Sequence, residues 1–334
     1  FNLASRSMGY TPPYTLTPTI VRLLADAAEA VGRLMGEQER VAPRLRKENR
    51  IRTIQATLQI EQNTFSVEQV TAILEGKRVR GSQREILEVK NASNAYENLS
   101  NWNPASRKDL LEAHRVLMEG LVECPGRFRS KGVGVVQGSR VVHMAPPAMR
   151  VPALVDDLLE WSKKTKEHPL VASCVLHYEL EFIHPFADGN GRLGRLWQTL
   201  ALSKWKPVFA DLPLESVVRD HQESYYASLG VSDKAADCAP FIEFMLRAIV
   251  QTLTPQVAPQ VTPQVAALLK AIGSRELDRA HLQEKLGLSD RKSFRALYLA
   301  PAMEQGLVEF TLPDKPNSRL QKYRATAAGK AVSR

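Results

Sequence analysis

The segment from His184 to Arg195 reads His-Pro-Phe-Ala-Asp-Gly-Asn-Gly-Arg-Leu-Gly-Arg and concentrates several chemically useful groups. It combines an imidazole that is largely neutral near pH 7, one carboxylate, a Gly-Asn-Gly turn and two guanidinium groups. Such groups can accept a proton from a hydroxyl, hold a divalent cation and neutralise a polyphosphate. The segment therefore predicts a phosphate site with a base at its edge.

Two helices are expected to position this segment. Apolar residues at helical spacing between Leu170 and Phe182 predict a helix, and Pro185 predicts that it ends near His184. A second apolar pattern predicts another helix from Arg192 onward. The intervening Gly-Asn-Gly residues tolerate positive φ, so we expect consecutive N–H groups to point into one concavity at the positive end of the second helix.

The segment has two other interpretations. The spacing Gly189-x-Gly191-x-x-Gly194 matches the dinucleotide fingerprint, but that motif needs a preceding strand and here a helix is predicted. The segment could also be a plain helix–turn–helix corner with solvated arginines. The whole set of groups favours a phosphate site over that reading, and Arg192 and Arg195, three residues apart on one helix face, could reach the same anion.

The twelve residues resemble the signature of the Fic (filamentation induced by cAMP) family, His-x-Phe-x-Asp/Glu-Gly-Asn-Gly-Arg-x-x-Arg, at every fixed position. The resemblance implies a helical core that transfers AMP from ATP to a Ser, Thr or Tyr hydroxyl of a protein substrate, which can be the chain itself. It also implies a role for each motif residue: His184 as general base, Asp188 as the Mg²⁺ ligand, Gly189, Asn190 and Gly191 as the anion hole, Arg192 and Arg195 against the β- and γ-phosphates, and Phe186 as the core anchor of the loop.

A second segment, Thr57-Leu-Gln-Ile-Glu-Gln-Asn63, resembles the inhibitory motif of the Fic class that is inhibited from its N-terminal side, Ser/Thr-x-x-x-Glu followed by Gly or Asn. The resemblance implies that Glu61, on a helix expected at about 53–63, pairs with Arg195 and blocks ATP. Gln62 departs from the pattern, and Glu61 could instead be an ordinary solvated glutamate. Removal of AMP from a modified protein, with Glu61 orienting a water, is the alternative chemistry at the same site.

Two further features accompany the core. Residues 133–147 predict a short hairpin with a proline-rich exit, which resembles the flap on which Fic proteins dock a target, although an ordinary surface hairpin would look the same. Tyr225 and Tyr226 fall on a predicted helix near the place where the family has its adenine pocket, and at least one of them is expected in the core.

The fold class expected is mainly α: a helical Fic core with a short β-hairpin flap, followed by an α+β winged helix-turn-helix. We divide the chain into an N-terminal arm and helical region with the inhibitory helix (1–90), the core (91–250), a Pro-Gln-Val linker (251–262) and the winged helix (263–334). The three Pro-Gln-Val units predict an extended linker, because proline disfavours helix and central strand.

Composition sets the remaining expectations. Apolar residues are 44% and charged residues 24% of the chain, as in ordinary globular proteins. The start Phe1-Asn-Leu-Ala-Ser lacks a secretory pattern, no apolar run is long enough to span a membrane, and the three scattered cysteines predict reduced thiols. We therefore expect a cytoplasmic protein without membrane contact.

The C-terminal segment carries most of the excess positive charge. Residues 263–334 hold thirteen Lys and Arg against seven Asp and Glu, a net charge of +6 out of +9 for the whole chain. The segment resembles the tail of many bacterial Fic proteins. It could bind DNA through Arg291, Lys292 and Arg295 in the third helix and Lys315, Arg319 and Lys322 in the wing, or dock a protein instead. A DNA-binding regulator whose core only senses nucleotide is the remaining alternative, and the resemblance is also compatible with a homodimer.

Overall fold

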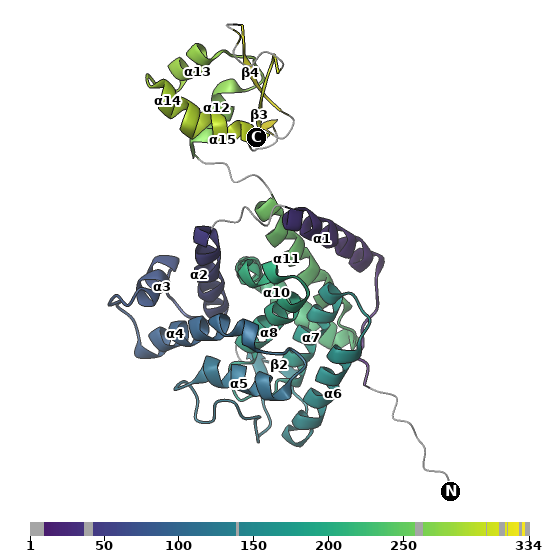
Figure 1. Ribbon diagram of the computed structural model, residues 1–334. Coiled ribbons are helices and arrows are strands. Elements are labelled where there is room, and N and C mark those ends of the chain that lie inside the picture. Colours follow the sequence, from purple (N-terminus) through teal and green to yellow (C-terminus); the bar gives the residue numbers. More distant parts are fainter. Residues whose placement is uncertain are drawn as a thin grey trace. The chain divides into compact units, whose positions relative to one another are not determined.

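The computed structural model describes residues 10–36, 43–137, 140–257, 263–304, 306–313, 318, 320–326 and 329–330. The chain divides into two compact units, Phe1–Val257 and Ala258–Arg334 (Figure 1). The first unit holds two buried apolar clusters and the second unit holds one.

The first unit is built almost entirely from helices, whose starts are fixed by local sequence. Ser66 and Ser82 form capping boxes with Gln69 and Glu85, and Pro169 occupies the first turn of its helix. The helices are α1 (Pro18–Gly36), α2 (Pro43–Ile60), α3 (Val67–Leu74), α4 (Gln83–Glu97), α5 (Arg107–Met118), α6 (Val151–Lys164), α7 (Pro169–Ile183), α8 (Asn190–Trp205), α9 (Leu214–Asp220), α10 (Gln222–Ala235) and α11 (Ala239–Val257), with short 3₁₀ turns at Leu99–Asn101, Ala148–Arg150 and Pro207–Asp211.

The paired helices α7 and α8 lie between two apolar clusters. One cluster joins them to α2, α4, α5 and α6, and the other joins them to α1, α10 and α11. Figure 1 shows α1 lying along α11 on the far side from α5. Because α7 and α8 are packed on both sides, the loop that joins them is held between rigid elements.

A two-stranded antiparallel hairpin, β1 (Gly134–Gln137) and β2 (Arg140–Met144), follows α5, with an irregularity between Val135 and Val136. This confirms the hairpin predicted from the sequence. It is the only sheet among the described residues of the first unit.

The second unit has the element order expected of a winged helix. Three helical segments, α12 (Pro263–Ile272), α13 (Arg279–Lys285) and a continuous stretch of α14 (Arg291–Ser293), a π-helical turn (Phe294–Leu299) and α15 (Ala300–Glu304), precede a hairpin of β3 (Val308–Phe310) and β4 (Tyr323–Ala325). Leu277 adds an antiparallel bridge to Tyr323. The π-helical turn lies just before Pro301, which has no N–H to continue an α-helical ladder.

Three expected boundaries differ from the structure. Residues 251–257 belong to α11 rather than to an extended linker. Leu253 is buried and holds this end of the helix, and one proline in the last turn removes only a single backbone hydrogen bond. Residues 258–262 lie outside the described part of the chain. Helix α4 crosses the expected boundary at residue 90. Helix α2 starts at Pro43 and ends at Ile60, so Glu61 lies in the turn that follows it.

Two general features concern location and redox state. None of the described helices is both long enough and apolar enough to cross a membrane. Cys124 is exposed, Cys174 and Cys238 are buried, and all three are free thiols.

Candidate active site

The signature residues form a tight loop between α7 and α8. His184 ends α7 in a left-handed conformation (φ 49°), and Gly189 (φ 83°) immediately precedes α8. Asn190 and Gly191 lie in the first turn of α8, so only Gly189 of the Gly-Asn-Gly residues has the positive φ expected for them. Glycine is needed at 189 for a second reason, because a side-chain carbon there would lie 2.6 Å from the Met118 sulfur.

Asn190 closes the loop by hydrogen bonds, and His114 packs against it. The Asn190 side chain exchanges two 2.9 Å hydrogen bonds with the backbone N–H and carbonyl of Phe186. Phe186 is fully buried and stacks on the His114 ring, with centroids 3.7 Å apart. His114 Nδ1 accepts from the Gly126 N–H, so the proton is on Nε2, which donates to the Asp188 carbonyl at 3.0 Å. Burial lowers the pKa of His114 to about 4, and the ring therefore stays neutral.

His184 is half-buried at the rim of the loop. Its Nδ1 lies 3.3 Å from the carbonyl oxygen of Glu181, one turn earlier in α7. A carbonyl can only accept, so this contact assigns the ring proton to Nδ1 and the lone pair to Nε2. The Nε2 atom can then act as a base.

Arg129 fixes the backbone on which His184 sits. Its guanidinium donates to the carbonyls of His184 (2.7 Å), Ile183 (3.3 Å), Pro146 (2.5 Å) and Lys131 (3.0 Å). Only 6% of Arg129 is exposed, and burial lowers the pKa of its guanidinium. This side chain therefore joins the end of α7 to the segments on either side of the hairpin.

Arg195 is held by the segment that contains Thr57 and Glu61. Its Nη2 donates to Glu61 Oε1 (2.8 Å) and to the Thr57 carbonyl (3.1 Å), and its Nε donates to the Thr57 hydroxyl (3.0 Å). The Arg195 side chain is 2% exposed. Burial opposes its charge, but Glu61 outweighs that effect and the pKa of Arg195 lies above its usual range. A side-chain carbon at Gly191 would lie 2.5 Å from Glu61 Oε1, so the carboxylate is packed against the first turn of α8.

The turn after Glu61 explains the departure at residue 62. Gln62 has φ 70°, a left-handed conformation that glycine and asparagine adopt most easily. The family pattern of Gly or Asn at this place therefore has a backbone reason. This chain keeps the same turn with a glutamine, at a cost in conformational strain.

Arg192 and Asp188 belong to a second charged group that involves α4. Arg192 lies 3.3 Å from Asp188 and 3.5 Å from Glu88, while Arg84 lies 3.4 Å from Asp188 and 3.5 Å from Glu88. The Asp188 carboxylate also accepts from the Gly189 N–H at 2.6 Å. Arg192 and Arg195 thus pair with different carboxylates, although we expected them to share one anion.

The two tyrosines differ in exposure. Tyr225 is 1% exposed and its hydroxyl lies 3.1 Å from Nε2 of the buried His177, so it is a core residue. Tyr226 is 40% exposed; burial and the nearby Glu61 raise the pKa of its hydroxyl. Tyr226 is therefore the one of the pair that a ligand beside Glu61 could contact.

Sequence reasoning missed four supporting residues, His114, Arg129, Arg84 and Glu88, and also Glu181. The Glu181 carboxylate lies near Gly194 and 3.8 Å from His177, and the charges of His177, His184 and Arg195 overcome its burial and lower its pKa. Single charged residues on helices carry no pattern in sequence. Only Arg129 had a signal, because it falls in the glycine-containing segment before the hairpin.

The comparisons with known proteins agree with this geometry. Residues 104–202 match the model of the Fic/DOC family, and residues 263–326 match that of the Filamentation induced by cAMP protein Fic-like, C-terminal domain. A Fic family protein from Desulfovibrio desulfuricans G20 of known crystal structure is 57% identical, with a TM-score of 0.72, and the similarity covers 95% of this chain and 99% of that one.

Curated relatives carry a more specific name. "Protein adenylyltransferase Fic" of Aedes aegypti is 32% identical over 223 residues, which cover 63% of this chain and 42% of that protein. "Protein adenylyltransferase fic-1" of Caenorhabditis elegans is 32% identical over 220 residues, covering 61% and 40%. The chain therefore spans about two fifths of the length of these relatives.

Proposed function

This chain belongs to the Fic family, and from that premise we propose that it transfers AMP from ATP to a hydroxyl of a protein substrate. The observation that carries the proposal is the arrangement around the start of α8. A histidine with its lone pair on Nε2, a carboxylate and two arginines lie on one loop and the first two helical turns that follow it. The names of the curated relatives support the same chemistry.

In this reaction the target hydroxyl oxygen attacks the α-phosphorus of ATP. The bond between that phosphorus and the oxygen bridging to the β-phosphate breaks, and pyrophosphate leaves. His184 Nε2 takes the hydroxyl proton. The ring is fixed for this step by the hydrogen bond from its Nδ1–H to the Glu181 carbonyl and by the backbone that Arg129 holds. Arg192 and Arg195 neutralise the leaving pyrophosphate, and the first N–H groups of α8 face the same charge.

The residues fit a divalent cation only when a ligand shares it. Among the described residues no cluster of three or more His, Cys, Asp or Glu side chains could hold a metal alone. Asp188 is 44% exposed at the loop, and Mg²⁺ commonly takes one or two carboxylates plus phosphate oxygens. Mg²⁺ held by Asp188 would supply charge neutralisation to the phosphates.

We propose that Glu61 inhibits this reaction by holding Arg195. The contact fills the guanidinium donors that a γ-phosphate would use, and the carboxylate sits against Gly191 where anionic oxygens would approach α8. Tyr226, beside Glu61, would border the adenosine.

The test uses Glu61→Gly with α-labelled ATP and Mg²⁺, followed by intact-mass measurement. We expect self-labelling to rise and one AMP to be added, and His184→Ala in the same background to abolish both. His221→Ala, which removes an exposed imidazole outside the loop, is the matched control. Labelling that survives in the His184 variant would remove the mechanism.

Removal of AMP is the second candidate. Glu61 binds Arg195 through Oε1, and its Oε2 accepts no hydrogen bond from any described residue. That oxygen could orient a water. Incubation of AMP-modified protein with wild type and with Glu61→Gly separates AMP removal from AMP transfer. A hydrolase loses AMP-removing activity without Glu61, whereas an inhibited transferase gains AMP-transfer activity.

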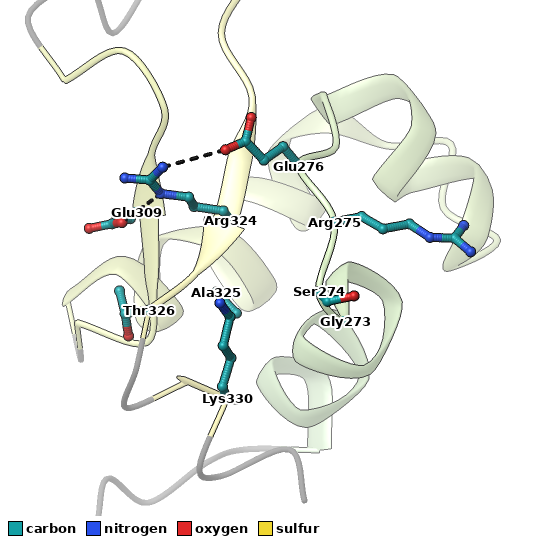
Figure 2. Close-up of a pocket in the computed structure, with 9 residues that line it drawn as sticks. All are labelled: Gly273, Ser274, Arg275, Glu276, Glu309, Arg324, Ala325, Thr326 and Lys330. Carbon is teal, nitrogen blue, oxygen red and sulfur yellow. Dashed lines mark hydrogen bonds and ion pairs between the residues drawn. The ribbon is translucent and has the colours of Figure 1, made fainter.

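We further propose that the second unit contacts the phosphates of DNA. Four of its acidic side chains contact other groups of the same unit. Asp278 and Asp290 cap helices. Arg324 binds both Glu309 (2.7 Å) and Glu276 (3.4 Å), and these three residues line a cavity of about 340 Å³ (Figure 2). Arg291, Lys292 and Arg295 in the third helix are exposed, as is Arg279 at the start of α13, and none of them has an acidic partner among the described residues. Lys322 is likewise exposed, whereas Lys315 and Arg319 lie outside the described residues.

A gel-shift of the full chain with duplex DNA tests this contact at low and moderate salt. We expect binding at low salt that weakens steeply as salt rises, and a lower slope for the Arg291→Ala/Arg295→Ala variant. Absence of binding at low salt would leave the unit as a protein-docking module and exclude a DNA-binding regulator.

A further inference from the structure

Four charged side chains form a closed ring beside the signature loop. Arg84 and Arg192 alternate with Asp188 and Glu88, and each arginine lies 3.3–3.5 Å from both acids. Two of the four residues come from the signature and two from α4. Helix α4 therefore contacts the loop through charge as well as through packing.

Glu88 also reaches the inhibitory turn. Its Oε2 accepts a 2.9 Å hydrogen bond from Asn63 Nδ2, two residues after Glu61. Asn63 is 5% exposed, and its own N–H bonds to the Leu58 carbonyl at the end of α2. A movement of the turn that withdraws Glu61 from Arg195 would therefore also strain or break the contact between Asn63 and Glu88.

Arg192 is held less completely than Arg195. Only 5% of its side chain is exposed, its contacts to acids are 3.3 and 3.5 Å long, and its buried Nε has no hydrogen-bond partner in the described structure. A buried guanidinium with an unused donor is poorly satisfied. An incoming phosphate would supply the missing acceptor if Glu88 released the group.

We propose that Glu88 is a second inhibitory carboxylate, which holds Arg192 as Glu61 holds Arg195, and that Asn63 makes the two releases concerted. The proposal rests on the proposed function, because it assumes that Arg192 and Arg195 bind the phosphates of ATP. Glu88 is 12% exposed, so salt and solvent screen its contact with Arg192 only partly.

The test measures binding of a non-hydrolysable ATP analogue with Mg²⁺ by calorimetry to wild type, Glu88→Gln, Glu88→Asp and Glu61→Gly. We expect Glu88→Gln to bind about five-fold tighter, the low end of typical coupling between sites. Glu88→Asp keeps the charge but withdraws the carboxylate from Arg192, so it should also bind tighter. Glu97→Gln, on the same helix with its side chain bonded to Ser93, changes net charge equally and should bind as wild type.

Concerted release adds a second requirement. The gain in affinity of the Glu61→Gly/Glu88→Gln double variant should differ from the product of the two single gains by about three-fold or more, because groups coupled through a shared turn are not additive. Asn63→Ala, which leaves both carboxylates in place, should reduce that difference. The Glu88→Asp variant keeps the proposal testable if Glu88→Gln fails to fold.

Three results would overturn the proposal: unchanged or weaker binding in Glu88→Gln, tighter binding in Glu88→Gln without any in Glu88→Asp, or multiplicative gains in the double variant. These outcomes are separate from the proposed function. If Glu61→Gly transfers AMP while Glu88 variants bind as wild type, only this inference fails; if Glu88 variants behave as expected but no AMP is transferred, only the activity fails.

Discussion

The pair between Glu61 and Arg195 gives a prediction that does not depend on measuring catalysis. Replacement of Glu61 by Gln keeps the shape of the side chain but removes its charge. Arg195 then remains 2% exposed, with its two bonds to Thr57 but without the carboxylate that bonds to it directly. A buried cation without a counter-charge destabilises the folded state.

The size of the effect follows from the exposure of the two partners. Loss of one partner from a fully buried pair costs roughly 3–5 kcal/mol. Glu61 is 28% exposed, and the glutamine can still accept one hydrogen bond, so we expect a loss of about 1–2 kcal/mol in the free energy of unfolding. An anion that binds Arg195 should restore this loss.

Urea denaturation with and without ATP and Mg²⁺ measures both parts. A ligand at about 100 times its Kd adds about 2.7 kcal/mol to the folded state. Under the proposed competition between Glu61 and ATP, the same ATP concentration should stabilise Glu61→Gln by more than it stabilises wild type. Glu112→Gln, which breaks an exposed i,i+3 pair with Arg115, is the control and should change stability by less than about 0.5 kcal/mol.

The reasoning would be refuted if Glu61→Gln were as stable as wild type and gained the same stability from ATP. That result would mean that Thr57 and solvent satisfy Arg195 and that Glu61 does not restrain it. A loss of stability without a larger response to ATP would keep the structural pair but reject its role in blocking the nucleotide.

Four further predictions concern the backbone at Gln62, the pH dependence of stability and the contacts of Arg129. Gln62→Gly should raise the free energy of unfolding by up to about 1 kcal/mol in urea denaturation, because glycine adopts φ 70° without strain. The pKa of His114, lowered to about 4 in the folded state, means that stability is lost as pH falls from about 6.5 towards 4, by about 3 kcal/mol in total. The pKa of buried Glu179, raised to about 7 mainly by burial, acts in the opposite sense, so stability is lost as pH rises from about 4.5 through 7. Arg129→Lys should cost about 3 kcal/mol in the free energy of unfolding and reduce AMP transfer, because one ammonium cannot bond to four carbonyls.

Matched variants separate these effects. His114→Gln and Glu179→Gln should each remove one of the two pH dependences and leave the other, which matters because the two oppose each other between about pH 4.5 and 6.5. Gln62→Ala should not stabilise the turn, since alanine resists positive φ as glutamine does. Unchanged stability in Arg129→Lys would show that the backbone of the loop holds its shape without the guanidinium.

Sequence alone determined the parts of the protein whose information is local. The order His-x-Phe-x-Asp-Gly-Asn-Gly-Arg-x-x-Arg fixed the loop, the helix break at His184 and the start of α8 to within two residues, because proline, glycine and capping preferences act over a few positions. The hairpin and the element order of the second unit were also predicted, from turn residues and periodicity.

The tertiary structure decided which other charges meet. The pair between Glu61 and Arg195 was expected from the family resemblance, whereas nothing in the sequence pointed to Glu88 or Arg84. These two residues are separated from the signature by about a hundred residues, and helix α4 brings them to it by packing of its apolar face. The same holds for Arg129 and His114, whose roles come from burial next to particular carbonyls. Burial and long-range contact set hydrogen-bond partners and pKa values, and neither is written in the spacing of residues along the chain.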